Sequence, residues 1–222
     1  STITGQAPTT PGNPNLKIET IEKLNIGADF SVWNARARFK VDVYSNITND
    51  LFVSQPLGAT TGFGGTSLPI NAGKMSNKGI EMAVDVDVIK TKNLSLTLGF
   101  NHAINKNKIE DLGLVSEYPA GTGIIRKGLP FGSHYTQHYL GADPATGRPT
   151  YKKADGTITT DINQAGLFAD FGTYLPKHVG GFTADITFHK ITVSALFSYQ
   201  FDVYRYNNIE SWTTRSTAGY IN

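Results

Sequence analysis

Alternation with a period of two is the feature of this sequence that most constrains its fold. Between Ile80 and Val88, large apolar side chains occupy every second position, and Glu81, Asp85 and Asp87 lie between them. Successive side chains of a β-strand point to opposite faces, so this pattern predicts a strand with one apolar and one polar face. A shift of one residue would exchange the two faces, and the register is therefore strongly determined.

Five further segments alternate in the same way. The six predicted strands cover about residues 20–32, 36–47, 78–89, 94–104, 178–189 and 191–203. They form three hairpins with tight turns, separated by long loops at about 48–77, 105–177 and 204–222. Residues 129–153, within the second long loop, have the pattern of a smaller hairpin around the Asp143-Pro144 turn. No segment has the periodicity of a three-turn helix, so the sequence predicts an all-β fold in one domain, residues 1–222.

Three features of these strands favour a membrane environment. Strands of soluble sheets are usually about 5–6 residues long, whereas membrane-spanning strands need about 9–11. Tight turns alternate with long loops, as periplasmic turns and extracellular loops do in outer-membrane barrels. The apolar faces carry almost no charge, and a Lys or Arg facing lipid at the bilayer midplane costs about 2–4 kcal/mol. A soluble sheet with one wetted face also alternates, and it is the competing interpretation.

Composition excludes several classes of function. The chain has 222 residues, no cysteine and a net charge of +2, and it contains no cluster of Lys and Arg typical of nucleic-acid binding. Without cysteine there are no disulfides and no thiolate metal sites. No nucleophile motif, phosphate-binding loop or credible Ser-His-Asp set is found, so we expect neither an enzyme nor a cofactor. We expect no signal peptide in this sequence, and it has no run of 18 apolar residues. A spanning β-barrel needs no such run, so a membrane is not excluded.

Five motifs, in this order, resemble the C-terminal barrel region of one family of outer-membrane proteins. They are NPNLKIET (13–20), NAGKMSNKGIEMAV (71–84), GADPATGRPTY (141–151), DGTITTD (155–161), and LPKHVGGF with SALFSYQF (175–201). The family is SusC/RagA, the TonB-linked transporters of the outer membrane. The resemblance covers nearly the whole chain.

The resemblance implies a large antiparallel transmembrane β-barrel of 22 strands with short periplasmic turns and long extracellular loops. It implies a nutrient importer of oligosaccharides or peptides, located in the outer membrane of a Gram-negative, Bacteroidetes-like cell and surrounded by its lipid. The expected partners are a SusD-like surface lipoprotein acting as a lid and TonB, which would act through an N-terminal part. The signal peptide, the TonB box, the plug and the terminal strand of that family are not found here, so the chain is expected to be one section of such a barrel.

The candidate site residues fall into two groups. Aromatic side chains of the long loops are expected to contact cargo or lid, or to pack within the loops: Phe63, Tyr118, Phe131, Tyr135, Tyr139, Tyr151 and Trp212. The acidic row Glu81, Asp85 and Asp87 is expected to face the lumen, as a solvated wall or as a surface for plug or cargo. His134 and His138 are four residues apart, but no carboxylate completes a set, so no metal site is predicted.

Two other functions remain open at this stage. One is a soluble β-sandwich or adhesin-type domain that binds glycans, which would bury the apolar faces between two sheets. The other is a passive, porin-like barrel without a plug or TonB contact. Six strands are too few to close a wide barrel in lipid, where an open edge leaves backbone groups unpaired.

Overall fold

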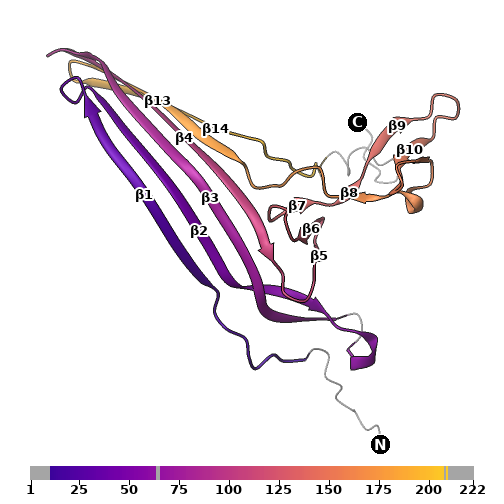
Figure 1. The fold of residues 1–222 in the computed structure, drawn as a ribbon. Helices are drawn as coiled ribbons and strands as arrows, with labels where there is room; N and C mark the ends of the chain where they lie inside the picture. Colours follow the sequence, from indigo (N-terminus) through magenta and orange to yellow (C-terminus); the bar gives the residue numbers. More distant parts are fainter. Residues whose placement is uncertain (1–10, 64–65, 208, 210–222) are drawn as a thin grey trace, which may run out of the picture.

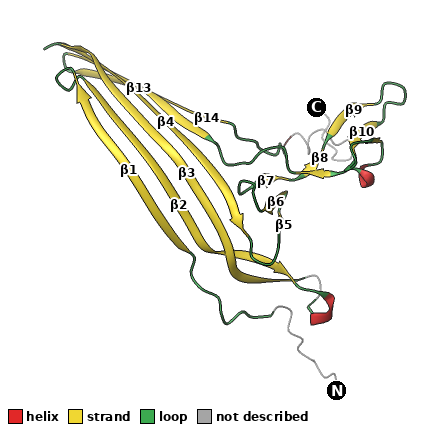
Figure 2. Ribbon diagram, in the orientation of Figure 1, coloured by secondary structure: helices red, strands yellow, loops and turns green. Residues whose placement is uncertain are grey.

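One sheet of six long antiparallel strands dominates the computed structural model, which describes residues 11–63, 66–207 and 209 (Figure 1, Figure 2). The strands are β1 (Thr20–Val32), β2 (Ala37–Pro56), β3 (Ser67–Lys90), β4 (Leu94–Asp111), β13 (His178–Phe188) and β14 (Ile191–Phe201). They lie in the order β1-β2-β3-β4-β13-β14, so each pairs with its neighbour along this series. Within the described residues β1 and β14 each pair on one side only, and the sheet is open.

Tight turns gather at one end of the sheet. Trp33, Asn34 and Ala35 connect β1 to β2 with positive φ angles of 54°, 56° and 61°, and His189 connects β13 to β14 with φ 53°. Residues 91–93 connect β3 to β4. Figure 1 shows all three turns at the same end of the sheet. The long connections are therefore at the opposite end, which confirms the predicted asymmetry.

The predicted loop over residues 48–77 is wrong for most of its length. β2 continues to Pro56 and β3 begins at Ser67, so the connection is only residues 57–66. Alternation disappears here because both faces of this extension are polar or mixed, yet the backbone ladder continues. Bulges on either side of Leu51, with Asp50 at φ 55°, interrupt the register. β4 likewise runs to Asp111, seven residues past its predicted end at 104.

The segment between β4 and β13 folds into three small sheets. Its strands are β5 (Glu117–Ala120), β6 (Gly123–Arg126), β7 (Ser133–His134), β8 (Thr136–Gln137), β9 (Tyr139–Ala142), β10 (Pro149–Lys152), β11 (Ile158–Thr159) and β12 (Leu167–Phe168). They are ordered β5-β6-β7, β11-β10-β9 and β12-β8. We call residues 112–177 the insert. The helical elements among the described residues are two 3₁₀ turns, η1 (Ala59–Thr61) and η2 (Ile162–Gln164), and no helix there is long and apolar enough to cross a membrane.

The hairpin predicted around Asp143-Pro144 is present as β9 and β10. The Asp143 carboxylate accepts hydrogen bonds from the Ala145 N–H at 2.9 Å and from the Thr146 hydroxyl at 2.7 Å. The hydrogen bond from Thr146, the larger effect, and the one from Ala145 lower the pKa of the Asp143 carboxyl. Figure 2 shows this hairpin projecting from the insert, away from the six-stranded sheet.

The six-stranded sheet has one apolar face and one polar face, as predicted. One row of cross-strand partners on the apolar face is Phe39, Val84, Phe100, Phe182 and Phe197. These side chains are not covered by a second sheet of the described chain, and Phe197 remains 66% exposed. A bulge after Asp87 pairs Ile89 with Leu96, so Val88 has no cross-strand partner on β4. The alternation that begins at Ile80 is interrupted there. An uncovered apolar face of this size marks a surface that meets lipid or protein.

A small buried core joins the insert to the sheet. It consists of Val53, Ile109, Leu112 and Ile125, each at most 3% exposed. Alternation along β4 places Ile109 on the same face as Asn105, the polar face, because the ladder to β3 is regular between them. The first part of the insert therefore packs against the polar side of the sheet, beyond the apolar band.

Candidate functional site

The polar face carries an ion-pair network near the tight turns. The Asp87 carboxylate accepts hydrogen bonds from the Arg38 guanidinium at 3.1 and 3.2 Å. It also accepts from Lys90 Nζ at 3.0 Å and from the Thr97 hydroxyl at 3.1 Å. The Asp87 side chain is only 10% exposed. Asp87 therefore holds β2, β3 and β4 together, and little of its carboxylate is open to a ligand.

The other two acidic residues of this row are more open. Glu81 is exposed and Asp85 is half-buried. Asp85 lies opposite Arg38, and Glu81 lies opposite Asp42. In contrast to Asp87, neither Glu81 nor Asp85 forms an ion pair with another described residue. Their carboxylates remain available at the polar face.

Hydrogen bonds continue along the polar face from the sheet to the insert. The Tyr44 hydroxyl donates to Asn105 Oδ1 at 3.0 Å, across Gly79. Two residues further along β4, Asn107 Oδ1 accepts from the Phe131 N–H at 2.6 Å, and its Nδ2 donates to Asn77. These contacts fix the start of the insert over the polar face.

Two of the predicted aromatic residues have structural contacts in the insert. Tyr118 and Phe131 both pack against the buried core. Burial raises the pKa of the Tyr118 hydroxyl, and Phe131 makes an edge-to-face contact with Tyr174, with ring centroids 6.4 Å apart. Much of their aromatic surface is therefore used in packing.

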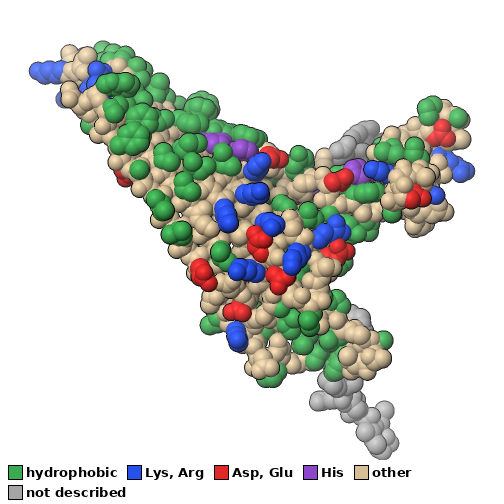
Figure 3. Space-filling view, in the orientation of Figure 1, with side chains coloured by type: hydrophobic (Ala, Val, Ile, Leu, Met, Phe, Trp, Pro, Cys, Tyr) green, Lys and Arg blue, Asp and Glu red, His purple; other side chains and the backbone are tan. Residues whose placement is uncertain are grey.

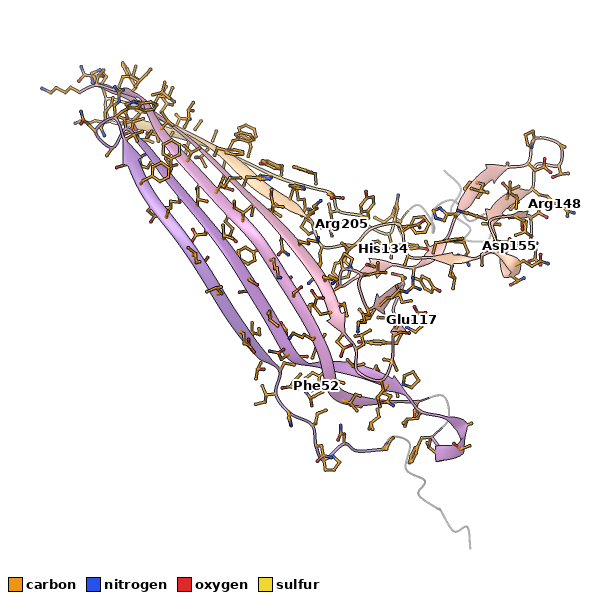
Figure 4. The ribbon with its side chains drawn as sticks, in the orientation of Figure 1. Phe52, Glu117, His134, Arg148, Asp155 and Arg205 are labelled. Atoms are coloured by element: carbon orange, nitrogen blue, oxygen red, sulfur yellow. The ribbon has the colours of Figure 1, made fainter. Side chains whose placement is uncertain are left out.

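Tyr135 lies at a cavity of about 560 Å³ in the insert. The Arg126 guanidinium carbon lies 5.4 Å from the centre of its ring, within cation–π range. The lining residues are Thr122, His134, Tyr135, Thr136, Asp170, Phe171, Tyr204, Arg205 and Tyr206. Figure 4 shows His134 and Arg205 near each other, where the chain after β14 meets the insert. The cavity thus combines four aromatic rings with charged groups of both signs.

Most of these cavity residues were not predicted. The His134 ring nitrogen Nε2 lies 2.8 Å from the carbonyl oxygen of Tyr204, a contact between residues 70 positions apart. Phe171, Tyr204, Arg205 and Tyr206 lie in segments without alternation. The one signal that the sequence offered for them was the group of aromatic residues just before β13 and just after β14.

His134 and His138 have different partners. His138 Nε2 lies 2.8 and 3.0 Å from the two carboxylate oxygens of Asp170, whereas His134 faces the Tyr204 carbonyl. The hydrogen bond from His138 lowers the pKa of the Asp170 carboxyl. His138 also contacts Phe171, with ring centroids 4.3 Å apart. These contacts give both histidines a role in ordering the cavity wall.

The remaining predicted aromatics lie at the periphery. Tyr139 on β9 and Tyr151 on β10 have ring centroids 6.0 Å apart, and Tyr139 is 62% exposed. Phe63 follows η1 at the tip of the β2–β3 hairpin, where its N–H donates to the Thr61 hydroxyl. Trp212 lies outside the described residues. The cavity therefore includes one of the seven predicted aromatics, Tyr135.

Long antiparallel strands, an uncovered apolar face, tight turns at one end and a folded insert at the other define a section of a large transmembrane β-barrel. A family model described as "TonB dependent receptor-like, beta-barrel" matches residues 2–221. The chain therefore belongs to this TonB-dependent receptor family, whose members are transporters and not enzymes and sit in the outer membrane of Gram-negative bacteria. This membership and the single uncovered sheet set aside the soluble β-sandwich.

Named relatives agree with this assignment. TonB-dependent receptor P3 of Formosa agariphila is 28% identical over 249 residues, covering 99% of this chain and 24% of the relative. TonB-dependent receptor SusC of Bacteroides thetaiotaomicron is 33% identical over 100 residues, 45% of this chain and 10% of SusC. A solved structure of the RagAB peptide transporter superposes with a TM-score of 0.80 at 26% identity, covering 94% of this chain and 24% of that one. The chain spans at most about a quarter of the length of these proteins.

Proposed function

We propose that this chain forms part of the wall and extracellular loops of a TonB-dependent importer of peptides or oligosaccharides. The polar face, with Glu81 and Asp85, would line the lumen, and the apolar face would meet lipid. Asp87 would stabilise the wall through its ion pairs. The likeness to SusC and to the RagAB peptide transporter supports this proposal.

The cavity in the insert is the observation that carries the cargo proposal. Ligand sites are concave, largely apolar and aromatic, with a few placed polar groups. Tyr135, Phe171 and Tyr206 supply ring faces that suit sugar rings or peptide side chains. Arg205 and Asp170 supply opposite charges that suit the termini and side chains of a peptide. The insert begins over the polar face, so cargo held there would lie at the mouth of the lumen.

The exposed tyrosine pair on β9 and β10 suits a different contact. We assign Tyr139 and Tyr151 to the SusD-like lid, because their hairpin projects away from the sheet and exposes an amphipathic ring surface of the kind enriched at protein interfaces. Phe63 and Trp212 are further candidates for contact with lid or cargo. Tyr118 and Phe131 would support the cavity from below through the buried core.

Uptake by whole cells tests the proposal. Cells that produce the complete protein are given labelled peptides or labelled oligosaccharides, with TonB present or deleted. We expect uptake of one cargo class, dependent on TonB, and at least a ten-fold loss in the double variant Tyr135→Ala/Phe171→Ala. TonB-independent uptake would instead identify a passive porin-like barrel, and uptake of neither cargo would refute the importer.

A further inference from the structure

The apolar face ends in a row of histidine and aromatic side chains. His102 Nδ1 lies 2.9 Å from the Tyr199 hydroxyl, and His178 Nδ1 lies 3.3 Å from His102 Nε2. The His178 ring stacks on Phe201 with centroids 4.3 Å apart. Rings with an apolar body and a polar edge are typical of the aromatic girdles at membrane surfaces. This row therefore marks one limit of the apolar band.

Strand geometry agrees with that limit. From Leu94 to Ile104, β4 advances ten residues on the apolar face, and Ile104 pairs with His178. At about 3.3 Å per residue and a tilt of about 40°, ten residues rise about 25 Å. This is about the height of the apolar band of an outer-membrane barrel. The row with Ile104 thus lies at the membrane surface on the side away from the tight turns.

Lysines follow directly on the same face. Ile80 on β3 and Ile104 on β4 are cross-strand partners. Two residues further from the tight turns, Lys78 on β3 and Lys106 on β4 are also direct cross-strand partners. Lys108 follows next along β4. Like charges directly opposite each other destabilise a strand pair. Both Lys78 and Lys106 are exposed, and neither forms an ion pair or a side-chain hydrogen bond with the described residues. Pairing within this part of the chain does not explain their position.

The carboxylates near this surface form ion pairs with Lys108 and Lys177, and Glu110 attracts Lys78 only from a distance, without an ion pair. Glu110 Oε2 accepts from Lys108 Nζ at 2.7 Å, and Glu110 Oε1 accepts from Ser76. Asp202 lies 3.7 Å from Lys177 Nζ. Figure 3 shows this face: hydrophobic side chains cover its half near the tight turns, histidines lie at the border, and Lys and Arg are interspersed with Asp and Glu beyond it. Past the histidines, Lys78 and Lys106 therefore remain without an ion pair to the described residues.

A groove beside β4 connects these charges to apolar surface. It has a volume of about 360 Å³ and lies where β4 extends beyond the start of β13. Lys106, Lys108 and Lys177 line it together with Asp202, Leu175 and Pro176. Lys108 pairs with Glu110 and Lys177 pairs with Asp202, so Lys106 supplies the unpaired charge of the groove. A cation beside apolar contacts at the membrane surface suits a charged amphiphile.

We propose that Lys78 and Lys106 bind the phosphate groups of a phosphorylated lipid whose acyl chains lie along the apolar face. The proposal rests on the membrane orientation in the proposed function. Lysine is a compact charge suited to phosphate, and basic residues near a membrane surface attract anionic lipid. The bound lipid would remove the repulsion between the two opposed lysines and fix the height of the barrel in the bilayer.

Native mass spectrometry of the complete protein, extracted from outer membranes, tests this site. Binding is measured with bisphosphorylated lipid A and, for comparison, with dephosphorylated lipid A. Inorganic phosphate is added as a competitor of the bound lipid. The variant K78Q/K106Q leaves the Lys108–Glu110 pair intact. The matched control is K40Q, which removes a lysine from the polar face of β2, where Lys40 lies opposite Ala83.

We expect bisphosphorylated lipid to bind the parent protein and K40Q equally, and to bind K78Q/K106Q less tightly by roughly five-fold for each lysine. Dephosphorylated lipid should not distinguish the variants, and millimolar phosphate should not displace the bound lipid. If the double variant fails to fold, K78Q and K106Q are compared singly, with about a five-fold loss expected for each.

Equal binding to the parent protein and the lysine variants would overturn the site, and so would displacement by free phosphate, which would indicate a soluble-anion site. Uptake is measured separately in the same cells. If the parent protein does not prefer the bisphosphorylated lipid but its TonB-dependent uptake is normal, the lipid site alone is refuted. Extraction without detergent, together with no uptake, refutes the proposed function itself.

Discussion

Arg38 and Asp87 are joined by two hydrogen bonds across β2 and β3, at 3.2 Å from Nη1 and 3.1 Å from Nη2. They are diagonal partners, because the residue directly opposite Arg38 in the register is Asp85. The Asp87 carboxylate also accepts from Lys90 and Thr97. One carboxylate thus connects three strands at the end of the sheet with the tight turns.

The first prediction concerns this carboxylate. Asp87→Ala should lower the temperature at which the folded barrel unfolds by several degrees, because Arg38 and Lys90 then lack their counter-charge and β4 loses the Thr97 contact. The heat-dependent mobility shift of the complete protein on detergent gels measures this temperature. Glu81→Ala is the control, since Glu81 is exposed on the same strand face. Equal unfolding temperatures for the two variants would contradict the assignment.

The second prediction concerns the close approach of strands at Gly79. A Cβ at this position would lie 2.4 Å from the Ile104 carbonyl oxygen and 2.5 Å from the Tyr44 ring. Gly79→Ala should therefore destabilise the sheet by about 1–3 kcal/mol. The amount of folded protein in the outer membrane measures the effect.

Two comparisons sharpen this test. Gly12→Ala is the control, since a Cβ there meets nothing within 4 Å. Tyr44→Ala added to Gly79→Ala should recover only part of the loss, because the Ile104 carbonyl remains. Full recovery would show that the ring is the sole constraint, and normal folding of Gly79→Ala would refute the close packing.

How far the sequence predicted the fold depended on where alternation continues. Val41, Met82 and Phe100 lie where one face is apolar and the other polar, so the pattern specifies both strand and face. Beyond Thr48 the same strand continues with polar and apolar residues mixed on both faces, so the period of two disappears although the backbone pairing does not. The predicted loop at 48–77 was wrong for this reason.

The candidate site was less predictable because its contacts are long-range. His134 and Tyr204 meet across 70 positions, and Ser133 forms an isolated bridge with Thr173. Strands of two residues, such as β7 and β8, carry no periodicity that sequence analysis can detect. Aromatic composition identified Tyr135, but it also selected Tyr118, which packs against the core.

The third prediction concerns the core that supports the insert. Leu112 is fully buried, whereas Leu114, two residues later, is 83% exposed. Leu112→Ala should destabilise the insert by about 2–5 kcal/mol, because it removes buried methyl groups and leaves a cavity. Limited proteolysis of the complete protein in detergent should then cut faster after Arg126 and Lys127. Leu114→Ala is the matched control and should be cut like the parent protein; faster cutting in both variants would contradict a role specific to the core.

The last prediction follows from the pairing of His138 with Asp170, which lowers the pKa of the Asp170 carboxyl below its usual 3.8. A carboxyl with a lowered pKa in the folded state adds stability above its unfolded pKa and loses that stability as the pH falls through the folded pKa. Hydrogen-exchange protection of amides 167–172, corrected for intrinsic rates, should therefore be constant from pH 5 to about 4 and fall below that.

Asp170→Asn should lower this protection already at pH 5 and flatten its dependence on pH, because the amide cannot ionise. The effect should be modest, since the Asp170 side chain is 60% exposed and solvent screens the pair. Asp143→Asn is the matched control: it removes the carboxylate from the β9–β10 turn and should leave the profile of 167–172 unchanged. A parent protein whose protection at 167–172 stays level down to pH 3 would show that the pair does not order this wall of the cavity.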